Sequence, residues 1–158
     1  MHLFKIIPTK KTEKWLKDNK LNINAIQYAL SLLYNDIIPH KNIKRIKLVL
    51  QVDYKHDSST YIFGTDKIFL CSDPDIYAKS FKQKKFVIFL HFLHEFRHWM
   101  QSRILGVKDS ELKYTEEDVE KNNAKYRKDK FEIDAREFEK KNVRRFMRYY
   151  MEYITSYQ

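Results

Sequence analysis

Glycine, cysteine and long apolar runs are all scarce in this chain of 158 residues. The only glycines are Gly64 and Gly106, and neither GxGxxG nor GxxxxGK[ST] occurs, which disfavours folds that bind phosphate through glycine-rich loops. Cys71 is the single cysteine, so no internal disulfide can form, and this suits a reducing compartment. The longest apolar run, residues 86–90, is far too short to cross a bilayer.

The N-terminus also lacks a recognisable signal. Residues 1–5 contain no apolar stretch of the length that a signal peptide needs. Together with the missing membrane span, this predicts a soluble protein in the cytoplasm or elsewhere inside the cell. The length predicts one domain covering residues 1–158.

The composition supports a folded core and a basic surface. Apolar residues make up 43% of the chain and aromatic residues 15%, which is enough to build a core. The net charge of +10 would attract nucleic acid, an anionic membrane or an acidic protein. Lysine, asparagine, isoleucine and tyrosine are abundant together, however, as coding by an AT-rich genome would produce, so the charge alone does not require a nucleic-acid function.

The first half of the chain predicts helices followed by a small sheet. Residues 12–34 have helical character, with Thr12 as a plausible N-cap and Asn24 as the cap of a second segment. Apolar and polar residues alternate over 46–53, which is typical of a half-buried strand. Turn residues 64–67 then separate two short apolar runs, which predicts a hairpin over residues 61–70.

The second half predicts two long helices with a charged connection between them. An apolar helix is expected over about residues 82–105, ended by Gly106. Residues 108–130 are charged, with a helical turn expected near 115–120, and a last helix is expected over 130–153. The element order predicts an α+β fold.

The run His94-Glu95-Phe96-Arg97-His98 has the pattern HExxH. Histidines four residues apart lie on one face of a helix, where both imidazoles can bind one Zn²⁺ ion at about 2.0–2.1 Å. Glu95 cannot readily be a third ligand, but it can reach a metal-bound water and act as general base. The alternative is a pair of solvated histidines, which the apolar surroundings of the motif make costly.

The residues after the motif constrain the identity of a third ligand. None of the six histidines comes after His98, so the pattern HExxHxxGxxH is absent and no later histidine can complete the site. A carboxylate is therefore expected.

HExxH followed by the sequence Glu132-Ile133-Asp134-Ala135 resembles the gluzincin peptidases, including the HtpX-like and ImmA/IrrE-like families. It is also similar to small phage-type metallopeptidase domains with HExRHxxQ and ExDA. The resemblance covers residues 86–104 and 130–139, and it implies a zincin-like fold with a small antiparallel or mixed sheet. It also implies that Glu132 is the third zinc ligand. Arg136 departs from the pattern, because related families often carry Asp or Asn at that position.

Several further residues are candidates for supporting roles. Asp134 is either a hydrogen-bond acceptor for a ligand histidine or an exposed helix carboxylate. His91 either lines the cleft, stabilises an oxyanion or is a hydrogen-bonded structural histidine. Arg97 and Gln101 are candidates for polar contacts on the surface or between helices. Packing is expected of Trp99 and Met100. An oxyanion-stabilising group is also expected, and Tyr149, Tyr150 and Tyr153 are among eleven tyrosines that offer one.

The sequence therefore predicts a zinc-dependent peptidase that acts on a protein or peptide substrate, with Glu95 as general base. The hairpin before the metal helix is a candidate for the strand that pairs with substrate. Two alternatives remain. One is a basic nucleic-acid-binding protein with a structural or vestigial zinc site, supported by Lys82, Lys84 and Lys85 and by the cluster at 140–145. The other is a helical interaction module without metal.

Overall fold

A mixed sheet forms one layer of the protein. The structure is a computed structural model that describes residues 3–38, 44–53, 59–73 and 81–157. In this part of the chain, the sheet contains β1 (Phe4–Pro8), β2 (Ile46–Asp53), β3 (Thr60–Tyr61) and β4 (Lys67–Cys71). The strand order is β1-β2-β4-β3. The first three strands of this order are parallel, and β3 pairs antiparallel with β4 at the edge.

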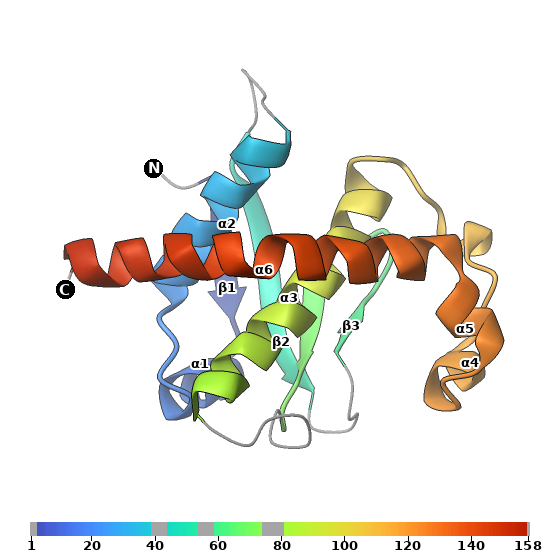
Figure 1. Cartoon of the computed structure of the whole chain (residues 1–158), viewed down its shortest axis with the longest axis horizontal. Coiled ribbons are helices and arrows are strands. Elements are labelled where there is room, and N and C mark those ends of the chain that lie inside the picture. The colour runs from blue at the N-terminus through green and yellow to red at the C-terminus, as the bar shows by residue number, and fades with distance from the viewer. Residues whose placement is uncertain (1–2, 39–43, 54–58, 74–80, 158) are drawn as a thin grey trace.

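Helices cover the sheet and extend beyond it (Figure 1). Their bounds are α1 (Lys10–Asp18), α2 (Ile23–Ile37), α3 (Phe81–Arg103), α4 (Glu116–Glu120), α5 (Ala124–Lys128) and α6 (Lys130–Tyr157). A single 3-10 turn, Asp109–Glu111, follows α3. The prediction of an α+β fold is confirmed. Among the described residues, no helix combines the length and the apolar character needed to cross a membrane.

The N-terminal elements differ from the prediction in detail. Thr12 is not an N-cap, because α1 begins two residues earlier and Thr9 accepts the capping hydrogen bond from the Thr12 backbone N–H. The Thr12 side chain is buried instead, and its hydroxyl accepts a hydrogen bond from the Val52 N–H at 3.0 Å. Asn22, rather than Asn24, caps α2. Strand β1 was not predicted.

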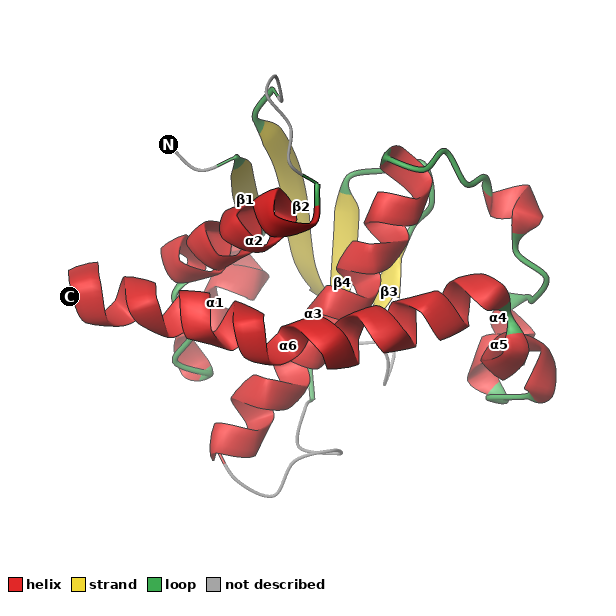
Figure 2. Ribbon diagram, turned by 45° about the horizontal axis from the view of Figure 1, so that its top comes forward, coloured by secondary structure: helices red, strands yellow, loops and turns green. Residues whose placement is uncertain are grey.

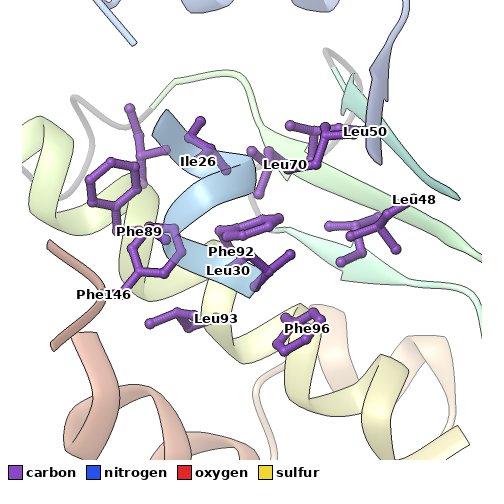
Figure 3. Close-up of a cluster of buried hydrophobic side chains, with 14 of the residues drawn as sticks. Ile26, Leu30, Leu48, Leu50, Leu70, Phe89, Phe92, Leu93, Phe96 and Phe146 are labelled. Carbon is purple, nitrogen blue, oxygen red and sulfur yellow. The ribbon is translucent and has the colours of Figure 1, made fainter. Parts of the chain in front are cut away.

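The core lies between the sheet, α2 and α3 (Figure 3). Buried side chains from the sheet include Leu48, Leu50 and Leu70, which meet Leu30 of α2. Apolar side chains also cover much of the α3 surface, and its buried members include Ile88, Phe89, Phe92, Leu93, Phe96, Trp99 and Met100. Helix α3 is consequently a central element with little freedom to shift, which is a suitable support for a precise site.

Helix α6 crosses both α2 and α3 on the side away from the sheet (Figure 2). It runs about 42 Å from end to end and extends past the predicted end of the last helix at residue 153. The connection before α6 was expected to contain one helical turn near 115–120, which is α4. It also forms the 3-10 turn and α5, and α5 packs against α6.

Candidate metal centre

Helix α3 presents His94, Glu95 and His98 at its contact with α6. The prediction of a helix that carries the motif is confirmed, and Gly106 has the positive φ of 72° expected just beyond the helix end. His98 and Glu95 are buried, with 4% and 6% of their surface exposed. His94 is half-buried, so the group is close to the surface but largely shielded from water.

Helix α6 brings Glu132 to the two histidines. Asp129 caps the start of this helix by accepting hydrogen bonds from the backbone N–H groups of Phe131, at 2.8 Å, and Glu132, at 3.4 Å. One turn further on, Ala135 is fully buried. Its small side chain allows the two helices to approach closely, as the spacing from Glu132 to Ala135 predicted.

The three side chains meet at one point. Glu132 Oε2 lies 3.1 Å from His94 Nε2, and Glu132 Oε1 lies 2.9 Å from His98 Nε2. The two Nε2 atoms are 3.1 Å apart. With one ligand atom taken from each residue, the three atoms lie within 4.8 Å of one another, so His94, His98 and Glu132 could hold a metal ion.

The far nitrogen of each imidazole has its own hydrogen-bond acceptor. His94 Nδ1 donates to Glu139 Oε2 at 3.1 Å, and His98 Nδ1 donates to Gln101 Oε1 at 2.8 Å. Placing the proton on Nδ1 points the Nε2 lone pair of a neutral imidazole into the centre, which is how outer groups prepare histidines for metal binding. Glu139 was not identified from the sequence, although it lies seven residues after Glu132 on the same helix face.

Gln101 connects the two helices at the site. Its amide Nε2 donates to Asp134 Oδ2 at 2.8 Å and to the Phe131 carbonyl at 2.9 Å, while its oxygen accepts from His98. Of the two alternatives for Asp134, a direct hydrogen bond to a ligand histidine is not the one formed among the described residues. Asp134 is reached through Gln101, and it also accepts from Arg97 Nε at 2.8 Å. Of the two alternatives for Arg97 and Gln101, contacts between helices are the ones formed.

The donor set fits a tetrahedral metal ion. Ligands at 2.0–2.1 Å from such an ion are separated from one another by about 3.3 Å. The two Nε2 atoms are 3.1 Å apart, and each lies 2.9 or 3.1 Å from a different Glu132 oxygen, so binding through a single oxygen needs a rotation of the Glu132 carboxylate. Two imidazoles with a carboxylate are a ligand set typical of catalytic zinc, which retains a further position for water.

Without an ion, the charges of the centre are balanced by protons. Burial by itself would lower the pKa of His94, but hydrogen bonds to Glu132 and Glu139 outweigh it and raise that pKa to about 10. Burial also opposes the charged form of His98, yet the hydrogen bond to Glu132 raises its pKa. For Glu132, burial acts to raise the pKa, but the two histidines hold it well below its ordinary value. A metal must therefore displace protons to bind.

Glu95 does not belong to the donor group but lies beside it. Burial raises its pKa, the carboxylates of Glu132 and Glu139 add to the rise, and the two histidines act in the opposite direction. A carboxylate with a raised pKa is a better proton acceptor than an ordinary one. The environment of Glu95 is therefore suited to general-base chemistry.

Two tyrosines from the connection between α3 and α6 reach the centre. The Tyr114 hydroxyl donates to Glu132 Oε1 at 2.9 Å. The ring of Tyr126 packs edge-to-face on Tyr114, with centroids 5.1 Å apart. Burial is the main cause of the raised pKa of each hydroxyl, and the charge of Glu132 adds to it. No sequence pattern marked either residue, because their segment has no periodicity that predicts a shared face.

The tyrosines suggested from the last helix lie elsewhere. Tyr149 donates to Asp36, and the Tyr150 hydroxyl accepts from the Asn22 N–H at 2.9 Å. Tyr153 packs against Tyr28. All three lie at least about 25 Å along α6 from Glu132, so none can act on a substrate at the metal centre.

The remaining candidates near the motif have packing or partial roles. Trp99 and Met100 are 1% exposed and belong to the core, as expected. His91 is half-buried one turn before His94, and burial lowers its pKa. It is not one of the clustered ligands.

Two of the basic residues that supported the nucleic-acid-binding alternative differ in their surroundings. Lys85 lies over the ring of Tyr150 at 5.3 Å, and the side chain of Lys82 lies outside the described part of the chain.

Comparisons of this chain with protein-family models, with characterised proteins and with solved structures gave no match.

Proposed function

We propose that this protein is a zinc-dependent peptidase of the gluzincin type with a zincin-like fold. The observation that carries the proposal is the convergence of His94, His98 and Glu132 from two helices, with both Nδ1 atoms held by acceptors. The position of the HExxH helix between a small sheet and a glutamate-bearing helix supports it. Zinc is favoured over magnesium or calcium because two of the three ligands are imidazoles.

A zinc ion bound to these residues would supply Lewis-acid chemistry, lowering the pKa of a water and polarising a peptide carbonyl. Glu95 then acts on protons: it accepts one from the attacking water and returns it to the leaving amine. His94 and His98 are kept in the correct tautomer by Glu139 and Gln101. The buried position of Glu95 and the ligands limits competing water.

The edge strand β3 is the candidate platform for an extended peptide. Among the residues that the structure describes, it pairs with β4 on one side only. The turn that follows is fixed to α3, because the Gly64 N–H donates to Ser102 Oγ at 2.8 Å. The Phe63 ring lies 5.8 Å from the ring of His98. A peptide added to β3 would thus pass close to the centre, and a substrate complex with the peptide away from this strand would reject the proposal.

The direct test is Glu95→Gln, which removes the base and preserves the shape. Zinc content should remain that of the native protein while peptide hydrolysis falls at least about 100-fold. Glu137→Gln is the matched control, because Glu137 is an exposed residue on α6 and the charge change is the same. Full turnover by Glu95→Gln would remove Glu95 from the mechanism. Absence of metal from untagged protein would favour an interaction module without zinc.

A second function, nucleic-acid binding, is favoured by the outer face of α6. Lys140, Lys141 and Arg144 are exposed there, and the helical spacing places them with Arg148 on one side. Binding through these residues should weaken steeply as salt is raised. Binding of DNA or RNA by the Glu95→Gln protein, lost on reversal of charges 140, 141 and 144, would establish it independently of hydrolysis.

A further inference from the structure

The two oxygens of Glu132 have different surroundings. Oε1 accepts the hydroxyl of Tyr114 at 2.9 Å as well as facing His98 Nε2. Oε2 faces His94 Nε2 at 3.1 Å, and Arg136 approaches it only to 4.0 Å. The Tyr114 hydroxyl thus donates a short hydrogen bond to Oε1, and the Tyr126 hydroxyl also interacts with the Glu132 carboxylate.

Tyr114 is held in this place from two directions. The neighbouring Lys113 backbone N–H donates to Asp129 Oδ2 at 3.2 Å, and Asp129 is the residue that caps the start of α6. The Tyr114 ring also packs against Tyr126. The position of the hydroxyl is therefore tied to the same helix end that carries Glu132, which makes the contact a built feature of the fold.

We propose that Tyr114 is a positioning residue that keeps Glu132 bound to the metal through one oxygen. A carboxylate can bind an ion with one or both oxygens. The hydrogen bond from Tyr114 occupies Oε1 and leaves Oε2 as the ligand atom. The protein then supplies three ligand atoms instead of four, and a position stays open for water. This inference rests on the proposed metal centre and adds to it the control of ligand number.

The test uses Co²⁺ in place of zinc in the full chain. Its visible absorption is strong with four ligands and weaker with five or six, so the spectrum reports the ligand number. Tyr114→Phe should lower the absorption per bound cobalt severalfold, because both oxygens of Glu132 become free to bind. Tyr150→Phe is the matched control: it removes a buried hydroxyl with a 2.9 Å hydrogen bond at a remote point, and its cobalt spectrum should equal that of the native protein.

An unchanged spectrum in Tyr114→Phe would overturn the inference, and so would an equal change in Tyr150→Phe. Infrared spectra of the native zinc-loaded protein provide a second measurement that does not depend on how the variant folds. The splitting of the Glu132 carboxylate bands, identified by subtracting Glu132→Gln, should be the wide one of single-oxygen binding. A narrow splitting contradicts the inference. Failure of the native protein to bind cobalt would instead refute the metal centre itself.

Discussion

Replacing Gln101 with leucine tests the account of how the centre is held. The side chain is 1% exposed and makes hydrogen bonds to His98, Asp134 and the Phe131 carbonyl. Leucine has a similar volume, so little cavity should form. The His98 Nδ1–H would be left buried without a partner, whereas Asp134 keeps its contact with Arg97. One unsatisfied donor and two lost hydrogen bonds should cost about 2–4 kcal/mol of unfolding free energy.

The assay compares stability and metal binding in the same protein. Denaturant unfolding of the metal-free form should show the loss of stability, and zinc titration against a competing chelator should show about 10–100-fold weaker binding. Gln27→Leu is the control, because Gln27 is also buried and accepts a hydrogen bond from the Ile6 N–H at 2.8 Å, in another part of the fold. It should lose stability but keep its zinc affinity. Native zinc affinity in Gln101→Leu would refute the reasoning.

Three further outcomes are expected. Glu139→Gln should weaken zinc binding about 10-fold, and Glu137→Gln should leave it unchanged in the same titration. In the metal-free protein, the raised pKa of His94 contributes stability that is complete below pH 6.5 and is lost as the pH rises to about 10. Melting temperatures of the metal-free protein should fall over that pH range. The rise in melting temperature on adding zinc should grow with pH, because zinc displaces the His94 proton, which is bound less tightly at higher pH. A rise that shrinks with pH would contradict this. Asp129→Ala should cost about 1–2 kcal/mol in denaturant unfolding through the lost cap of α6, and an unchanged midpoint would show that the cap is dispensable.

The elements that the sequence predicted well have strong local patterns. The strand over residues 46–53 and the last helix each contain a sustained apolar period, and the motif helix has a high content of apolar residues. Strand β1 was missed because it is short and because Ile7, an apolar residue at an exposed position, breaks its alternation of apolar and polar residues. Its partner β2 is nearly forty residues away and pairs in parallel, so no turn signal joins the two.

The sequence could predict only the part of the candidate site that follows from the spacing of residues on one helix. His94 and His98 follow from their separation by one turn. The same reasoning could have found Glu139, two turns after Glu132, and Gln101, three residues after His98. The hydrogen bond between Tyr114 and Glu132 depends on how residues 104–129 fold back onto α6. No local sequence pattern predicts how this segment folds back. The role of Asp134 stayed open between two alternatives, because the sequence could not show that the side chain of Gln101 lies between Asp134 and the histidine.

The most direct measurement is a crystal structure of the untagged protein with anomalous data collected on both sides of the zinc absorption edge. The account predicts a single strong zinc peak within about 2.0–2.2 Å of His94 Nε2, His98 Nε2 and a Glu132 oxygen. An ordered centre without such a peak, or a zinc ion bound by other residues, would contradict it.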